Sequence, residues 1–367
     1  MKYIVIITVF ILSIFSGCMK TTTSKDITPS PILKVKEIGR GGDISPAPIL
    51  DEPVGGGGDI VSPSVVEGAV TAPIISPSDS TSYKSKIKVE AGVLTAGDID
   101  DKLNLKYFKK YIKDRKDKNY LSINLNQYSK LKPQNISSQK LDLSFVIDAT
   151  GSMGDEMQYI SKELLDIIEN INRDYPKIDI RVAITLYRDK GDDYLIRNFD
   201  FDDNIQQVVA NLKKQTASGG GDYPEAMEKG LFKGLNNLWQ KNSVKIMFLL
   251  ADAPPHQQNI KDIKRVINKA RAKGVRIYPI SGSGVDDKTE FIMRHLAYLT
   301  DAKYIFLSND SGVGNSHKEP KIRCYQVTKL DNLIQRVIES EISGDKLEPS
   351  QRDIIRRVGH YDRGVCR

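Results

Sequence analysis

The chain has 367 residues, 40% of them hydrophobic and 28% charged, a composition typical of a globular protein with a sizeable core. Lysine and arginine (54) exceed aspartate and glutamate (47), which gives a formal net charge of +7, but the basic residues form no dense cluster with interleaved aromatic side chains. We therefore do not expect nucleic-acid binding and interpret the excess charge as part of a solvated surface.

Residues 1–17 predict a signal peptide. Lys2 precedes an apolar run, residues 4–15, that is too short to cross a bilayer comfortably as a helix. The run ends in Phe15-Ser-Gly-Cys18, which resembles a bacterial lipoprotein box with phenylalanine in place of the usual leucine. The resemblance implies cleavage before Cys18 and lipidation of that residue; the alternative is an ordinary secreted protein with a cysteine near its cleavage site.

The residue after Cys18 bears on location. It is Met19 and not an aspartate that would retain a lipoprotein in an inner membrane. We therefore expect a lipid-anchored protein of the bacterial cell envelope, on the outer membrane or the cell surface.

Residues 18–86 are rich in serine, threonine, proline and glycine and contain an imperfect repeat, at residues 41–46 and 57–63. Such a segment buries too little apolar surface to offset the entropy of ordering it. It predicts a disordered tether that holds a domain away from a membrane, although the repeat could also serve as a docking motif.

Residues 87–140 have a mixed composition and predict a segment that precedes the main domain. Apolar residues at helical spacing indicate a short amphipathic helix over 103–112. Asp98, Asp100 and Asp101 could hold calcium, but a capped, solvated helix start is the favoured interpretation.

Residues 141–343 alternate between strand and helix patterns. The six expected strands are residues 141–147, 178–186, 194–201, 244–251, 275–280 and 303–307, and the expected helices are 155–174, 203–215, 224–238, 261–273, 289–300 and 330–342. The connection before residue 194 is too short for a parallel crossover and predicts a hairpin. We therefore expect an α/β fold: a doubly wound, mostly parallel six-stranded sheet with helices on both faces.

The first of these strands ends in a group of oxygen-bearing side chains. Asp148, Thr150 and Ser152 stand at alternate positions on a tight turn that opens a helix. Mg²⁺ prefers about six oxygen ligands and keeps some of its waters, so a few protein oxygens suffice to hold it. The pattern Asp-x-Thr-x-Ser after a buried strand resembles the metal-ion-dependent adhesion site of von Willebrand factor type A (VWA) domains.

Asp252, which ends the fourth strand, is expected at the same place. If the strand order is 3-2-1-4-5-6, Asp148 and Asp252 end the two strands that flank the reversal of order, where ligands bind in doubly wound sheets. This convergence follows from the topology alone.

The resemblance implies a further ligand in the loop over residues 216–225. Most VWA domains have a threonine after two glycines here, whereas this chain has Gly221-Asp222. We choose Asp222 as the ligand, directly or through water, with Thr216 as the second choice; Asp222 could equally cap the following helix. With Asp148, Asp222 and Asp252 ionised, the site would carry about one negative charge with its ion, so its partner need not be acidic.

Enzyme chemistry is not expected. Gly151-Ser152-Met153-Gly154 is a near miss to a hydrolase nucleophile motif, and His256 could act as a base for Ser152, but Ser152 already has a use as a metal ligand. The histidines at positions 256, 295, 317 and 360 show no zinc-site spacing.

Three cysteines are an awkward number in an oxidising compartment. Lipidation of Cys18 would leave Cys324 and Cys366, which can pair and tie the tail, residues 344–367, to the segment before the last helix; two unrelated thiols are the alternative.

Together these features predict an envelope lipoprotein whose VWA domain binds a protein or extracellular-matrix partner, as in cell adhesion. The expected cofactor is Mg²⁺, with Mn²⁺ or Ca²⁺ as alternatives. The second hypothesis is a non-adhesive scaffold or regulatory subunit of an envelope complex, in which the metal is structural.

Overall fold

The computed structural model describes residues 82–84, 89, 92–115, 121–122, 124–132, 134, 139–310, 312–362 and 365–366. The expected signal peptide, the lipidated Cys18 and all of the expected tether except Ser82–Lys84 lie outside these residues. Within the described ranges, no helix combines the length and the apolar character needed to cross a membrane.

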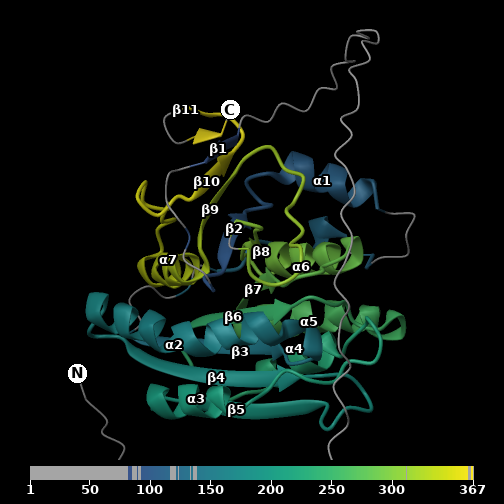
Figure 1. Ribbon diagram of the computed structural model, residues 1–367, viewed down its shortest axis with the longest axis vertical. Coiled ribbons are helices and arrows are strands. Elements are labelled where there is room, and N and C mark those ends of the chain that lie inside the picture. Colours follow the sequence, from purple (N-terminus) through teal and green to yellow (C-terminus); the bar gives the residue numbers. More distant parts are fainter. Residues whose placement is uncertain are drawn as a thin grey trace, which may run out of the picture. The chain divides into compact units, whose positions relative to one another are not determined.

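A mixed sheet forms the centre of the described part (Figure 1). It contains the six expected strands: β3 (Lys140–Asp148), β4 (Asp179–Tyr187), β5 (Ile196–Asp202), β6 (Val244–Ala251), β7 (Arg276–Ser281) and β8 (Tyr304–Leu307). Their order, β5-β4-β3-β6-β7-β8, is the one on which the expected meeting of Asp148 and Asp252 depends. All are parallel except β5, which is antiparallel to β4 as the short connection predicts.

The sheet has more strands than the six expected. The sheet has ten strands, because β2 (Thr95–Ile99), β9 (Tyr325–Lys329), β10 (Arg356–Val358) and β1 (Ser82–Lys84) continue it antiparallel beyond β8. Nine of the ten lie between Thr95 and Val358. The segment expected to precede the domain therefore contributes a strand to its sheet, and so does the C-terminal tail.

Sequence analysis does not predict strand β2, because Thr-Ala-Gly-Asp-Ile has low strand propensity. The structure explains its glycine. A Cβ atom on Gly97 would lie 2.5 Å from the ring of Phe306 on the neighbouring strand β8, so only glycine allows this approach.

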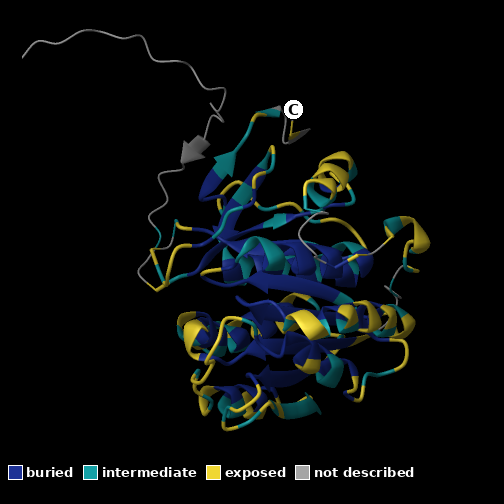
Figure 2. Ribbon diagram, turned by 90° about the vertical axis from the view of Figure 1, so that its right-hand side faces the viewer, coloured by how far each residue is buried: buried dark blue, intermediate teal, exposed yellow. Residues whose placement is uncertain are grey.

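Helices cover both faces of the sheet, as predicted. One face packs against α2 (Gly154–Asp174), α3 (Ile205–Lys213) and α7 (Leu330–Ser343), and the other against α4 (Met227–Leu235), α5 (Ile260–Lys273) and α6 (Asp287–Leu299). Figure 2 shows buried strands between helices whose outer surfaces are exposed. Helix α1 (Leu105–Lys113) packs on α6, with the buried Phe108 ring 5.0 Å from that of Tyr298.

Strand β6 shows how the sequence pattern produces this layered core. Its nearly continuous apolar run sends alternate side chains to opposite faces: Phe248 enters the α2 side, while Met247 and Leu249 enter the α4 side. Each fully buried side chain of this size stabilises the fold by about 1.5–3 kcal/mol. The run therefore fixes β6 at the centre of the sheet, beside β3.

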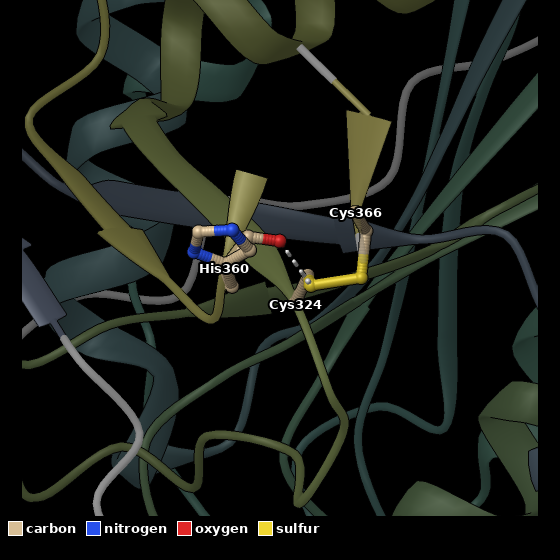
Figure 3. The surroundings of a disulfide bond; sticks show 3 residues. All are labelled: Cys324, His360 and Cys366. Atoms are coloured by element: carbon tan, nitrogen blue, oxygen red, sulfur yellow. Dashed lines mark hydrogen bonds between the residues drawn. A yellow bond between two sulfur atoms is a disulfide. The ribbon is translucent and has the colours of Figure 1, made fainter. Parts of the chain in front are cut away.

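The C-terminal tail is held by a disulfide. Cys324 and Cys366 are bonded, as expected (Figure 3). Cys366 lies in β12 (Val365–Cys366), which pairs with β11 (Tyr361–Asp362), and the bond joins this hairpin to Cys324, directly before β9. The Cys324 sulfur also lies 3.6 Å from the carbonyl oxygen of His360. Gly359 must be glycine, because its φ is +89° and a Cβ atom there would lie 2.2 Å from a backbone oxygen.

Candidate metal site

Asp148 and Asp252 come together at the carboxyl ends of the adjacent parallel strands β3 and β6, as predicted. Asp148 is fully buried and Asp252 is 4% exposed. Burial, followed by the charge of Asp252, raises the pKa of Asp148 to about 7; burial also raises the pKa of Asp252 to about 6. One oxygen of each carboxyl group has no hydrogen-bond partner among the described residues.

The turn after β3 brings hydroxyl groups to the same place. Thr150 donates to Asp148 Oδ1 from its backbone N–H (3.0 Å) and from its hydroxyl (2.7 Å). Its Oγ1 lies 3.4 Å from the Oγ of Ser152. Ser152 is exposed on a short 3₁₀ turn, Gly151–Met153, that leads into α2. A carboxylate and two hydroxyls therefore face one small region, and Ser152 opens it to solvent.

Glu225 is a member of this site that sequence analysis misses. Its side chain is 4% exposed, and its backbone N–H donates to the carbonyl of Pro254 beyond β6 (2.9 Å). Gly220, with φ +80°, leaves the space that Glu225 occupies: a Cβ atom there would lie 2.7 Å from Glu225 Oε1 and 3.1 Å from Cβ of Thr150. The Glu225 carboxyl group therefore lies beside Thr150.

The electrostatics of Glu225 support this placement. Burial raises its pKa to about 9, with further contributions from Asp148, Asp189, Asp192 and Asp252. Its Oε2 has no hydrogen-bond partner within the described part of the chain. Carboxyl and hydroxyl oxygens are the ligands that a hard divalent cation takes. The carboxyl oxygens of Asp148, Glu225 and Asp252 do not all lie within 4.8 Å of one another, so one ion would need bridging water or side-chain rotation to reach all three.

The structure does not bring Asp222 or Thr216 into this group. Asp222 is exposed, and its carboxylate lies within 4.8 Å of ligand atoms of Asp189 and His256. It does not cap the helix either, because α4 begins at Met227 with Ala226 as its N-cap and has no side-chain capping bond. Thr216 is exposed, and its carbonyl accepts from Arg188 (2.7 Å).

The helix boundary explains why Asp222 lies where it does. A helix beginning at Pro224, as the sequence suggests, would place Asp222 at its start. The real helix begins three residues later, so the glycine-rich loop extends far enough for Glu225 to take that place. Both acidic residues are visible in the sequence, but helix ends are the least reliable part of a pattern-based prediction.

Residues 142–314 match the family model described as von Willebrand factor A domain. The chain contains a VWA domain. The match runs from β3 to just past β8 and so includes the whole candidate metal site, whereas β2, β9 and β10 lie outside it. The adjacent Asp189, Asp222 and His256 are a further acidic and histidine group that could hold a metal ion. A VWA domain supports protein–protein interaction as a general role.

Two curated proteins share local similarity with the chain. A protein described as an ariadne-like RING finger protein of Acanthamoeba polyphaga mimivirus is 27% identical over 187 residues, 46% of this chain and 18% of that protein. The alpha-protein kinase vwkA of Dictyostelium discoideum is 27% identical over 121 residues, 33% of this chain and 19% of that protein. The chain thus spans less than a fifth of the length of these relatives.

Solved structures with weak overall similarity include the pilus adhesin SpaC of Lactobacillus rhamnosus GG, which has a TM-score of 0.37 and 14% identity over 48% of this chain and 28% of that chain. Another is the conserved hypothetical protein BatB of Bacteroides thetaiotaomicron, with a TM-score of 0.38 and 11% identity over 56% of this chain and 98% of that chain. A third is an aerotolerance-related membrane protein of Bacteroides fragilis, with a TM-score of 0.36 and 9% identity over 56% of this chain and 99% of that chain.

The raised pKa values predict how the effect of Mg²⁺ on stability changes with pH. Without metal, the folded state holds protons on Asp148 and Asp252 that the unfolded state releases above about pH 4, so these groups lose their stabilising contribution as pH rises through 6 and 7. Mg²⁺ needs the ionised carboxylates, so its stabilising effect should grow over the same range.

Thermal unfolding with EDTA or Mg²⁺ at pH 5.5 and pH 8 measures this difference. We expect a larger rise in Tm on adding Mg²⁺ at pH 8, and no such rise in the Asp148→Asn variant. An equal or smaller rise at pH 8 in the parent protein would contradict the assignment of these carboxylates to a metal.

Proposed function

We propose that the protein is a lipid-anchored envelope protein whose VWA domain binds a protein or extracellular-matrix partner through a divalent cation, Mg²⁺ in the first instance. The observation that supports this most is the set of unpartnered, buried carboxylate oxygens on Asp148, Glu225 and Asp252, next to the exposed hydroxyl of Ser152. A cation held by these residues would remain reachable from solvent on the Ser152 side, where a partner could add an oxygen ligand.

The charge of the site bears on the partner. The carboxylate counted for Asp222 is replaced by that of Glu225, so three ionised carboxylates would still surround a divalent cation and leave about one negative charge. Such a site attracts an acidic partner residue less than a neutral site does. We therefore propose that a carbonyl or hydroxyl oxygen of the partner can complete the site.

The proposed location rests on the sequence and on one structural feature. The lipoprotein-like box at Cys18 supplies the anchor, and removing Cys18 from the cysteine count leaves the pair that forms the Cys324–Cys366 disulfide. Structural disulfides persist mainly in oxidising compartments, which fits an envelope protein. Mass spectrometry of the membrane fraction tests the anchor. A lipid mass on Cys18 would support the proposal, and an unmodified Cys18 would contradict it.

We also propose that the chain is not an enzyme. His256, the base considered for Ser152, has its Nε2 2.8 Å from Asp189 Oδ1, and Ser152 lies with Thr150 at the metal site. Turnover of ester or peptide substrates by the full chain that is lost in Ser152→Ala would overturn this proposal.

Partner capture from envelope extracts tests the binding role. We expect the full-length protein to retain a partner in Mg²⁺, to release it in EDTA, and to lose at least about 10-fold in affinity in Ser152→Ala because one metal ligand is gone. The exposed Ser218→Ala, in the nearby glycine-rich loop, is the matched control and should retain the partner.

The scaffold hypothesis makes the opposite prediction for the same proteins. If the ion only stabilises the loops, EDTA and Ser152→Ala will lower the Tm while partner capture persists in the fraction that stays folded. The burial of Asp148 and Glu225 is the observation that supports this second function. Measuring Tm and partner capture on the same samples separates the two.

A further inference from the structure

Three side chains from three different loops meet next to the VWA metal site. Asp189 follows β4, Asp222 lies in the glycine-rich loop before α4, and His256 follows β6. One ligand atom from each lies within 4.8 Å of the other two, and His256 Nε2 is 2.8 Å from Asp189 Oδ1. None of Asp148, Glu225 or Asp252 belongs to this group.

We propose that Asp189, Asp222 and His256 form a second metal site, which binds a divalent transition-metal ion such as Mn²⁺ or Zn²⁺. An imidazole nitrogen with two carboxylates suits these ions, whereas the first site has only oxygen donors and suits Mg²⁺. With metal–ligand distances of about 2.0–2.2 Å, neighbouring ligands of one ion lie roughly 3 Å apart. The three side chains are therefore close enough to bind one ion after small rotations.

The surrounding loops hold the most buried ligand in place. Asp189 is 7% exposed, and its backbone N–H donates to Asp192 Oδ2 (3.0 Å). Asp192 also accepts from the backbone N–H of Gly220 at 3.1 and 3.2 Å. The loop that carries Asp189 is thus bonded to the loop that carries Asp222, so their separation is set by the fold.

An independent feature also indicates a cation here. Asp189 and His256 line a cavity of about 320 Å³ together with Glu228 of α4. Glu228 is fully buried, and its Oε2 has no hydrogen-bond partner among the residues the structure describes. Its other oxygen accepts from Asn259 (2.8 Å) and lies 3.9 Å from the Lys229 ammonium. A buried carboxyl oxygen without a partner is costly, and a cation or its bound water in this cavity would satisfy it.

The competing explanation is a hydrogen-bonded Asp189–His256 pair with Asp222 left in solvent. The two explanations differ in a spectroscopic signature. Mn²⁺ bound by His256 shows ¹⁴N coupling in pulsed electron paramagnetic resonance, whereas Mn²⁺ in the all-oxygen first site does not. The signature therefore reports on the second site even when both sites are loaded.

The experiment uses the full chain loaded with Mn²⁺, with stoichiometry from equilibrium dialysis. We expect the parent protein to bind two ions, with ¹⁴N coupling. His256→Gln and Asp222→Asn should each lose one ion, and His256→Gln should also lose the coupling. Asp193→Asn, an exposed charge-matched control in the same loop as Asp189, should behave like the parent.

Asp148→Asn separates this proposal from the proposed function, since it should lose the first ion and keep the second with its ¹⁴N coupling. Because Asp222 is exposed, its variant should keep the parent fold, which circular dichroism checks. Absence of ¹⁴N coupling in the parent, or coupling that survives in His256→Gln, would overturn the second site. Loss of both ions in Asp222→Asn would also overturn it, because the two groups would then be one site.

Discussion

Replacing Glu225 with glutamine should lower the Mg²⁺ affinity of the VWA domain by at least about 10-fold, whereas Asp222→Asn should change it by less than about threefold. Glu225 is buried beside Thr150 and has an unpartnered oxygen, while Asp222 is exposed and lies with Asp189 and His256. Isothermal titration of Mg²⁺ into the two variants and the parent protein measures the difference.

The two variants remove the same charge from the same loop, so each serves as the control for the other. Mg²⁺ is the suitable probe because the group with His256 favours transition-metal ions. A larger loss of affinity in Asp222→Asn than in Glu225→Gln would contradict this prediction. It would show that Asp222 is the metal ligand at the position where most VWA domains have a threonine, and that Glu225 does not bind the metal.

Replacing Asp101 with asparagine should lower the free energy of unfolding by about 3 kcal/mol, because it breaks a buried ion pair and leaves a cation without its main partner. Asp101 accepts from Arg294 of α6 at 2.5 and 2.9 Å, and both side chains are 3% exposed. Glu290 remains as a second partner of Arg294 at 3.1 Å, which keeps the loss at the lower end of the usual range.

Urea unfolding of Asp101→Asn and of the exposed control Asp114→Asn tests this prediction. The result also bears on the organisation of the chain, since Asp101 precedes the region that the family model covers. A loss below about 1 kcal/mol would mean that the segment around β2 and α1 contributes little to the stability of the VWA domain.

The central half of the fold is predictable because its strands follow simple patterns. The apolar runs locate β3 and β6, and the short connection predicts the β4–β5 hairpin; with the strand order usual for a doubly wound sheet, Asp148 and Asp252 then meet. Thr150 and Ser152 then follow from their positions on the turn. These inferences need the strand positions, which periodicity indicates, and the usual strand order of a doubly wound sheet.

The remaining features depend on tertiary contacts that no local pattern contains. Strand β2 has low strand propensity, and its glycine is explained only by the close approach of Gly97 to Phe306 in the folded sheet. The sequence pattern therefore does not predict that the sheet extends beyond β8. The acidic residues around Ile99 show the same limit. Asp98 pairs with Lys303 (2.8 Å) and Asp101 with Arg294, whereas only Asp100 accepts from backbone N–H groups of the turn before α1, those of Lys102 (2.9 Å) and Leu103 (3.2 Å). Glu225 depends on a helix end that shifts by three residues.

The most direct test of the metal-binding account is a crystal of the protein grown with Mn²⁺ and measured at the manganese absorption edge. We predict an anomalous peak within bonding distance of oxygens from Asp148, Ser152 and Glu225, with Asp252 beside it. No peak at this position, with the carboxyl groups of Asp148 and Glu225 turned elsewhere or hydrogen-bonded to protein groups, would contradict the account.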